Sequence, residues 1–217
     1  MPALQPFAFY TEHRLVVLTG LQARNLHELL RLLHEVSGSA IFYHTHHRYL
    51  AHHFEKPVFY NDFALWASEA LQAEELAEKL AAIDLLAFTT IRQLREAIIA
   101  VVTEFLAQQT NNARDCPEGD EFHFCQSKSF IMPTGIVAHS VPEFFACLPR
   151  ITTSTLYFHF FEARLRLGHT TNDFSRWLAD NGEAKLARAI DKLDPYLPTL
   201  DELKARIIKL GHKHLQA

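Results

Sequence analysis

The sequence predicts a mainly α protein made of two homologous helical units packed with pseudo-twofold symmetry, each beginning with a short extended or β segment. The chain matches itself at an offset of 115 positions, and both halves carry helix-capping patterns followed by apolar residues at helical spacing. The apolar fraction of 48% and the charged fraction of 21% are typical of an ordinary globular protein. We expect units at 1–110 and 121–217, joined by a polar linker at 111–120.

The internal match runs without a gap over forty-four residue pairs, of which ten are identical. Unrelated segments of this length would share roughly two or three residues. The identical pairs are Phe7/Phe122, Phe9/Phe124, Thr19/Thr134, Gly20/Gly135, Ala23/Ala138, Glu28/Glu143, Leu33/Leu148, Ser39/Ser154, His44/His159 and Leu50/Leu165. Such a repeat predicts one structural unit present twice.

Residues 7–18 and 122–132 are the predicted extended segments. Phenylalanines occupy alternate positions at the start of each, and in the first segment a short β-branched run follows them. Both segments run into a Thr-Gly pair, where Gly20 and Gly135 can supply a turn. We therefore expect short strands or arms that end at these glycines.

Capping patterns predict where the helices begin. Asn25 and Ser140 each stand three residues before a glutamate, and these glutamates, Glu28 and Glu143, are interpreted as capping residues rather than catalytic acids. Further helix starts are predicted near Ser39 and Ser154 for two long central helices, at Asn61-Asp62 and Asn172-Asp173 for short helices that carry a tryptophan, and at Thr90 and Thr199 for the last helices.

Composition excludes several classes of function. The net charge is −4 without a cluster of lysine and arginine, so nucleic acid is not an expected partner. No apolar run approaches the length that crosses a bilayer, and the first residues lack the pattern of a secretory signal. Three cysteines at irregular spacing suit a reduced compartment. We expect a cytoplasmic protein with no membrane partner.

Histidine is the compositional excess, and the alignment suggests a metal site. His44 aligns with His159, and His47 aligns with Glu162, one helical turn further on. Two helices that meet at the pseudo-twofold axis would offer these four side chains to one divalent transition metal. The alternative is a polar stripe along each helix, with Glu162 and Arg166 as an ordinary pair.

A second candidate site would bind a small anionic ligand. Arg164 falls on the apolar side of its predicted helix, where an arginine needs a carboxylate or an anion as its partner. Asp173 and its aligned counterpart Asp62 complete this candidate ligand site. A structural salt bridge between Arg164 and Asp173 is the alternative.

Two other clusters have weaker signals. His46, Tyr49 and His53 share a face of the first central helix, and their counterparts in the second are mostly apolar, which suits either buried histidines with hydrogen-bonded rings or a diverged site. Cys116, His123 and Cys125 are one ligand short of a zinc site.

Two classes of function follow. The first is a binding module that holds a small ligand or a metal at the seam between the repeats. The second is a non-catalytic regulatory or interaction protein, with a homodimer or another protein as partner. An enzyme ranks third, because acid and base candidates occur without a nucleophile, a phosphate-binding loop or a cofactor motif.

Four strings carry a resemblance over essentially the whole chain: STLYFHFFEARLRLG, NDFSRWL, IFYHTHHRYL and the pair EFHF and PTG. They resemble an uncharacterised bacterial and archaeal family, a domain of unknown function of about this length. The resemblance implies a prokaryotic cytoplasmic protein, and it transfers no catalytic residue.

Overall fold

The computed structural model describes residues 5–47, 59–108, 114–163, 165, 171–193 and 198–216. In chain order, the elements of the first half are β1 (Phe7–Ala23), α1 (Leu26–Glu35), α2 (Gly38–Phe42), the π-helix η1 (Tyr43–His47), α4 (Asp62–Glu69), α5 (Glu74–Ala81), the 3₁₀ turn η2 (Leu85–Ala87) and α6 (Ile91–Gln108). The second half comprises β2 (Phe122–Ala138), α7 (Val141–Cys147), the 3₁₀ turn η3 (Leu148–Arg150), α8 (Thr153–Tyr157), the π-helix η4 (Phe158–Glu162), α10 (Asp173–Asp180), α11 (Ala184–Asp191) and α12 (Leu200–Leu215). None of the helices in these ranges is long and apolar enough to cross a membrane.

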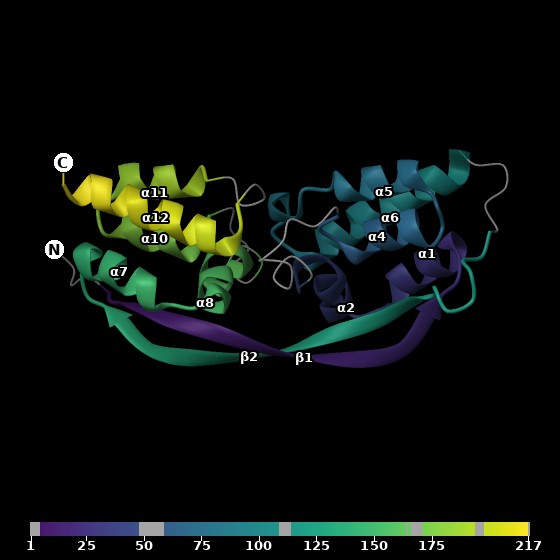
Figure 1. Ribbon diagram of the computed structural model, residues 1–217, viewed down its shortest axis with the longest axis horizontal. Helices are drawn as coiled ribbons and strands as arrows, with labels where there is room; N and C mark the ends of the chain where they lie inside the picture. Colours follow the sequence, from purple (N-terminus) through teal and green to yellow (C-terminus); the bar gives the residue numbers. More distant parts are fainter. Residues whose placement is uncertain are drawn as a thin grey trace. The chain divides into compact units, whose positions relative to one another are not determined.

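The fold is α+β, so the predicted mainly α class with short extended segments is wrong. β1 and β2 are each 17 residues long and pair with each other in an antiparallel two-stranded ribbon. Figure 1 shows the two strands side by side along their length. The prediction failed because each strand continues beyond the glycine at which it was expected to end.

A threonine side chain carries each strand past its glycine. Gly20 and Gly135 both have φ of +76°, a left-handed conformation that interrupts ordinary strand pairing. The hydroxyl of Thr19 donates to the Phe124 carbonyl oxygen at 2.6 Å and accepts from the Leu21 amide at 3.1 Å. Thr134 bonds in the same way to Phe9 and Ile136. Each strand thus continues through its Thr-Gly pair instead of turning there.

The chain forms two compact units, and each contains the beginning of one strand and the helices of the other half of the sequence. The described part of the N-side unit falls in 14–47 and 59–128, and that of the C-side unit in 5–13 and 129–216. The first half of β1 therefore packs with α7 to α12, and the first half of β2 packs with α1 to α6. The boundaries of the sequence repeats themselves stay a prediction.

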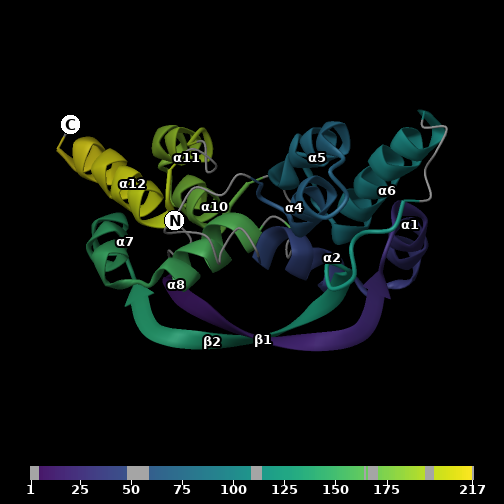
Figure 2. The same cartoon turned by 45° about the vertical axis from the view of Figure 1, so that its right-hand side comes forward.

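The helices make corresponding contacts within the two units. α4 packs on α5 and α5 on α6, as α10 packs on α11 and α11 on α12. The last helix of each unit also contacts the first, α6 with α1 and α12 with α7. Figure 2 shows α7, α10, α11 and α12 from a second angle.

Phenylalanines at the start of each strand connect the ribbon to the helices. Phe122 and Phe124 are buried in the N-side unit, where the Phe122 ring contacts Phe63 and Trp66. In the C-side unit, buried Phe7 and Phe9 pack on an aromatic cluster that consists of Phe144, Phe174 and Trp177. Each buried phenylalanine contributes about 2 kcal/mol of transfer free energy, so these rings anchor the strands firmly.

The predicted helix starts are largely confirmed, whereas the length of the two central helices stays a prediction, because 48–54, 164 and 166–168 lie outside the described residues. The described beginning of each central segment is a five-residue α-helix that continues as a five-residue π-helix, η1 or η4. The helices begin after Ser37 and Thr152, rather than near Ser39 and Ser154. Because a π-helix has more residues per turn than an α-helix, faces assigned at α-helical spacing shift beyond this point.

Candidate functional site

His44 and His159 occupy equivalent positions in the two π-helices, and both side chains are buried, at 4% and 3% exposure. Next to His44, the Thr45 hydroxyl donates to the Ile41 carbonyl oxygen at 2.7 Å, a side-chain bond to the helix backbone. Wider π-helical turns frequently occur at functional positions. Here each π-helix directs its imidazole toward the β-strand in the same unit.

The carboxylate partner of each histidine is held by a helix cap. Asn61 caps α4 by accepting from the Ala64 amide at 2.8 Å, and Asn172 caps α10 by accepting from the Ser175 amide at 2.9 Å. The next residues, Asp62 and Asp173, are the first of their helices, where the helix dipole favours a negative charge. The predicted Asx starts therefore also position the two aspartates.

In the N-side unit, His44 connects helix to strand through both ring nitrogens. Nδ1 lies 2.8 Å from Oδ2 of Asp62, and Nε2 accepts from the Cys125 amide of β2 at 2.9 Å. A backbone amide can only donate, so Nε2 carries no proton and Nδ1–H donates to the carboxylate. The hydrogen-bond partners thus determine the tautomer.

The C-side unit repeats this network with its own residues. His159 Nδ1 lies 2.7 Å from Oδ2 of Asp173, and Nε2 accepts from the Tyr10 amide of β1 at 2.9 Å. Each histidine therefore connects the helices of one half of the sequence to the strand of the other. We call each set of aspartate, histidine and strand amide a strand clamp.

The hydrogen bonds of the strand clamps occupy two of the predicted metal ligands. Both ring nitrogens of His44 and of His159 have hydrogen-bond partners, so neither ring offers a lone pair without losing a bond. Glu162 is buried, and His47 is partly buried. Over the described residues, no group of three or more His, Cys, Asp or Glu side chains is placed to hold a metal ion. The four-ligand site takes residues from both units and stays a prediction.

The structure describes two of the three predicted ligand-binding residues. Asp62 and Asp173 bind the clamp histidines, a role that the sequence did not predict. Arg164 lies outside the described residues.

His46 is a buried histidine of the N-side unit with a hydrogen-bonded ring, which is the first of the two interpretations given for its cluster. Its ring stacks on Phe42 at 5.3 Å between centroids, and its Nδ1 lies 3.1 Å from the Thr45 hydroxyl. Burial, with a smaller contribution from the charge of Arg14, lowers the pKa of His46 from 6.5 to about 4, although a hydrogen bond with the backbone of Leu85 acts in the opposite direction. Tyr49 and His53 lie outside the described residues.

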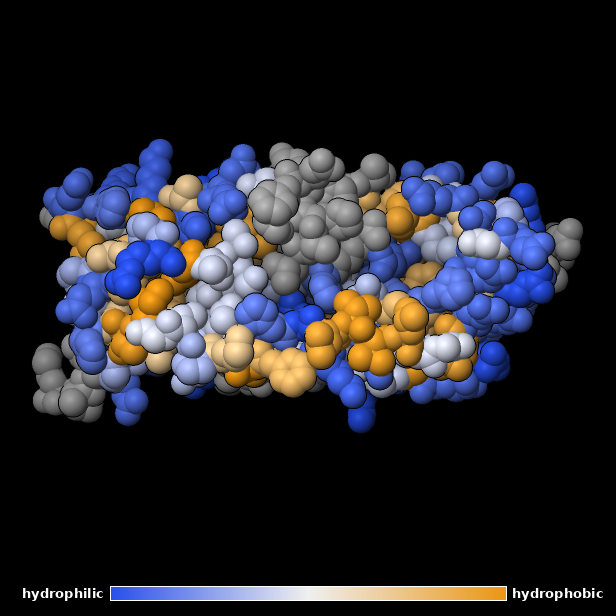
Figure 3. All heavy atoms as spheres, turned by 60° about the horizontal axis from the view of Figure 1, so that its bottom comes forward, coloured by the Kyte–Doolittle hydropathy of each residue, from blue (hydrophilic) through white to orange (hydrophobic). Residues whose placement is uncertain are grey.

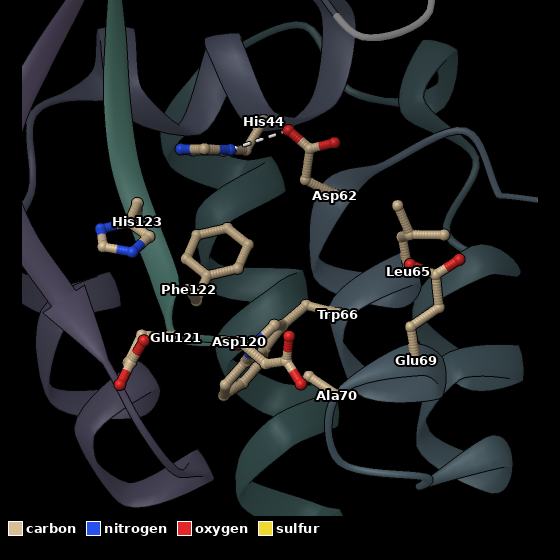
Figure 4. Close-up of a pocket in the computed structure, with 10 residues that line it drawn as sticks. All are labelled: His44, Asp62, Leu65, Trp66, Glu69, Ala70, Asp120, Glu121, Phe122 and His123. Atoms are coloured by element: carbon tan, nitrogen blue, oxygen red, sulfur yellow. Dashed lines mark hydrogen bonds and ion pairs between the residues drawn. The ribbon is translucent and has the colours of Figure 1, made fainter. Parts of the chain in front are cut away.

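A pocket opens beside the clamp of the N-side unit, with a volume of about 340 Å³. Its lining consists of His44, Asp62, Leu65, Trp66, Glu69, Ala70, Asp120, Glu121, Phe122 and His123. Figure 4 shows the four carboxyl groups distributed around Trp66 and Phe122. This lining contains no lysine or arginine, so the pocket has a negative potential.

Three of the pocket carboxylates have no cationic partner among the described residues: Glu69, Asp120 and Glu121 have no ion pair there. Their field reaches beyond the pocket. The pKa of the Cys116 thiol is raised first by burial and then by the negative charges of Glu121 and Asp120. Burial, with a smaller contribution from the charge of Asp62, likewise raises the pKa of Cys125, so the surroundings of both thiols disfavour the thiolate form.

Two of the four acidic residues of the lining have no acidic counterpart in the other half of the sequence. In the sequence alignment, Asp120 and Glu121 correspond to Gln5 and Pro6, and Leu65 corresponds to Arg176. The other two carboxylates of the lining, Asp62 and Glu69, have the acidic counterparts Asp173 and Asp180. The two units therefore share the clamp and differ in the charge around it.

Sequence reasoning missed this pocket. Its carboxylates come from α4 and from Asp120 and Glu121, which end the predicted linker at 111–120 and begin the predicted second unit, far from α4 in the sequence. The indole of Trp66 holds the linker in place by donating to the Asp120 carbonyl oxygen at 2.7 Å. The acidic pair Asp120-Glu121, absent from the other half, was the available signal.

Comparison with known proteins gives one solved structure to report, titled the structure of OrfY from Thermoproteus tenax. It is 28% identical to this chain, with a TM-score of 0.83, and the match covers 99% of this chain and 98% of that one. No curated protein matches. The model of a family of unknown function, DUF5752, matches residues 4–211. The predicted resemblance to an uncharacterised family is confirmed, and the chain belongs to DUF5752.

Proposed function

We propose that this protein is a small-ligand-binding module, and that its ligand is a positively charged organic molecule bound in the acidic pocket of the N-side unit. The observation that carries the proposal is the group of three carboxylates, Glu69, Asp120 and Glu121, that line one pocket with no ion pair in the described part of the chain. The lining carries negative charge without a lysine or arginine to balance it, and a bound cation would supply that balance.

The volume and the aromatic lining of the pocket support an organic cation as the ligand. A volume of about 340 Å³ lies at the small end of the range for ligand pockets, which suits a metabolite-sized amine. Trp66 and Phe122 line the same space, and aromatic faces attract ammonium and guanidinium groups.

The clamp supports binding rather than catalysis. His44 with Asp62 resembles the imidazole and carboxylate of an acid-base pair, and the pocket lies beside it. However, Nε2 of His44 already accepts from the Cys125 amide and cannot take a proton from a ligand without breaking that bond. We therefore assign the pair to holding the strand.

Isothermal titration calorimetry with spermidine and 1,4-diaminobutane tests this proposal. We expect binding that weakens as salt is added, because the attraction is electrostatic. Glu69→Gln and Asp120→Asn should each weaken it about three- to tenfold, as expected for one partly exposed charge.

Asp180→Asn is the matched control, because it removes an acidic residue at the aligned position of the C-side unit. This variant should bind spermidine as the wild type does. Absence of binding by the wild type, or an equal loss in Asp180→Asn, would refute an acidic pocket that recognises amines.

The sequence-based hypotheses accompany this proposal as predictions. A metal held by His44, His47, His159 and Glu162 at the seam between the repeats is tested by native mass spectrometry with elemental analysis of untagged protein. The same spectrum would reveal an anion carried near Arg164. A cytoplasmic location without a nucleic-acid partner likewise stays an expectation.

A further inference from the structure

A second pocket lies in the C-side unit, and its volume is about 340 Å³. Its lining consists of five hydroxyl side chains, two isoleucines, Arg150 and His13. The hydroxyls belong to Thr11 of β1, to Thr134 of β2, and to Thr152, Ser154 and Thr155 at the start of α8. The ribbon side of the molecule, brought forward in Figure 3, carries side chains of intermediate hydropathy, the range of threonine and serine, beside hydrophobic ones.

The charge of this pocket is opposite to that of the acidic pocket. Arg150 lines it, and no aspartate or glutamate is among the described residues of the lining. Glu12, which lies between Thr11 and His13 in β1, is buried and does not line the pocket. Arg150 is exposed at the end of η3, and its guanidinium has no ion pair or hydrogen bond with the described part of the chain. The lining therefore has a positive potential and a guanidinium that a ligand can bind.

Other donors of the lining have no protein partner either. The hydroxyls of Thr11 and Ser154 and the ring of His13 make no hydrogen bond within the described ranges. A hydroxyl can donate one hydrogen bond, and an imidazole carries at least one N–H in either protonation state. The Thr134 hydroxyl, in contrast, is already used, because it donates to the Phe9 carbonyl oxygen at 2.8 Å. Two hydroxyls and one imidazole thus accompany the guanidinium.

Hydrogen bonds hold the segment that follows Arg150. The Thr152 hydroxyl caps α8 by accepting from the Thr155 amide at 3.2 Å, and Lys204 Nζ donates to the Ile151 carbonyl oxygen at 3.3 Å. Groups that are held in place before a ligand arrives lose less conformational freedom when it binds. The pocket is therefore largely preformed on this side.

The aligned segment of the N-side unit differs in charge and in hydrogen bonding. Glu35 stands at the position of Arg150, and its carboxylate pairs with Arg31 at 3.1 Å. The Ser37 hydroxyl donates to Gln126 Oε1 at 3.2 Å, so it is already occupied. The combination of an unpaired guanidinium with unused hydroxyls thus belongs to the C-side segment of this aligned pair.

We propose that the C-side pocket binds a phosphate group, either as free phosphate or as the ester of a small metabolite. The guanidinium of Arg150 would hold two phosphate oxygens, because its fork matches that geometry. Thr11, His13 and Ser154 would donate to the remaining oxygens, which a planar carboxylate lacks. The two isoleucines of the lining leave an apolar side for an organic group. This site is independent of the amine pocket in the other unit.

Titration of the full-length, nitrogen-15-labelled chain with inorganic phosphate and with glycerol 3-phosphate, followed by amide NMR spectra, tests the proposal. Both anions should shift the amide signals of 11–13 and 150–155. The aligned amides at 35–40 should not shift, which provides a control within the same spectrum. Glycerol, which has no charge, should leave all these signals unchanged. Tighter binding of the ester would identify an organic phosphate as the ligand, and equal binding would identify free phosphate.

Substitutions of Arg150 measure its contribution to binding. Arg150→Gln should weaken phosphate binding about tenfold, as expected for the loss of a charge-assisted hydrogen bond. Arg150→Lys should bind with intermediate affinity, because it keeps the charge and lacks the fork. If either variant does not fold by circular dichroism, Ser154→Ala removes one donor and should weaken binding about threefold.

Arg188→Gln is the matched control, because it removes an exposed arginine from α11 of the same unit. It should bind phosphate as the wild type does. Absence of shifts at 150–155 with either anion at about 10 mM, a concentration that detects even weak binding, would overturn the proposal. Equal weakening by Arg188→Gln and Arg150→Gln would overturn it as well, since it would show attraction by net charge alone.

Discussion

Replacing His46 with phenylalanine should remove part of the acid sensitivity of this protein. In the C-side unit, Phe161 aligns with His46 and is buried, and its ring stacks on Tyr157 at 5.0 Å, as His46 stacks on Phe42 at 5.3 Å. The chain thus already contains the variant at an equivalent position. His46→Phe should keep the packing and remove the ionisable group.

The size of the effect follows from the pKa of His46, which is lowered from 6.5 to about 4. Above pH 6.5, the ring is neutral in the folded and the unfolded chain, and ionisation contributes nothing to stability. As the pH falls from 6.5 to about 4, the unfolded chain binds a proton that the folded chain does not, so the free energy of unfolding falls. The total loss approaches about 3 kcal/mol.

Urea unfolding of the wild type and of His46→Phe, followed by circular dichroism between about pH 7 and pH 4.5, measures this contribution. The free energies of unfolding of the two proteins should diverge on acidification, with the wild type losing more stability. Comparing the slopes cancels the other titrating groups and any constant cost of the substitution. Parallel curves would refute the reasoning, because they would show that His46 takes up protons equally in both states.

Two further predictions concern packing and the strand clamps. His44→Ala and His159→Ala should each lower the free energy of unfolding by about 2–4 kcal/mol, because each variant leaves a strand amide and a carboxylate unpaired. Urea unfolding measures this loss. A loss under about 0.5 kcal/mol would contradict the structural role of the histidine. Gly211→Ala should destabilise α12 by about 1–3 kcal/mol, because the new methyl group would clash with the Phe145 ring and its helix propensity recovers only about 1 kcal/mol. Its cost should shrink in a Phe145→Leu background, and an unchanged cost in this double-mutant cycle would place the strain elsewhere.

Local capping was predictable from the sequence because its partners are three residues apart. Thr199 accepts from the Glu202 amide at 3.2 Å, and the Glu202 carboxylate accepts from the Thr199 amide at 2.9 Å, which confirms the predicted capping box. The side chains of Asn25 and Ser140 likewise accept from the amides of Glu28 and Glu143. A hydrogen bond of this range depends on residue type and spacing alone.

The strand length and the fold class could not be predicted in this way. A Thr-Gly pair predicts a turn, and at Gly20 the backbone does adopt the expected positive φ. Whether the strand then continues depends on the partner strand, which supplies the Phe124 carbonyl oxygen for the Thr19 hydroxyl. That partner lies more than a hundred residues away, so local pattern cannot reveal it.

The sequence by itself determined that two aligned halves each carry a histidine at the same position, an Asx-capped helix and phenylalanines at the start of an extended segment, because these are properties of residue type and order. Only the tertiary structure decided that each strand clamps to the helices of the other half. It alone brought Glu69 beside Asp120 and Glu121. Both features depend on contacts between residues that are distant in the sequence. Such contacts form only when the whole chain packs and buries them.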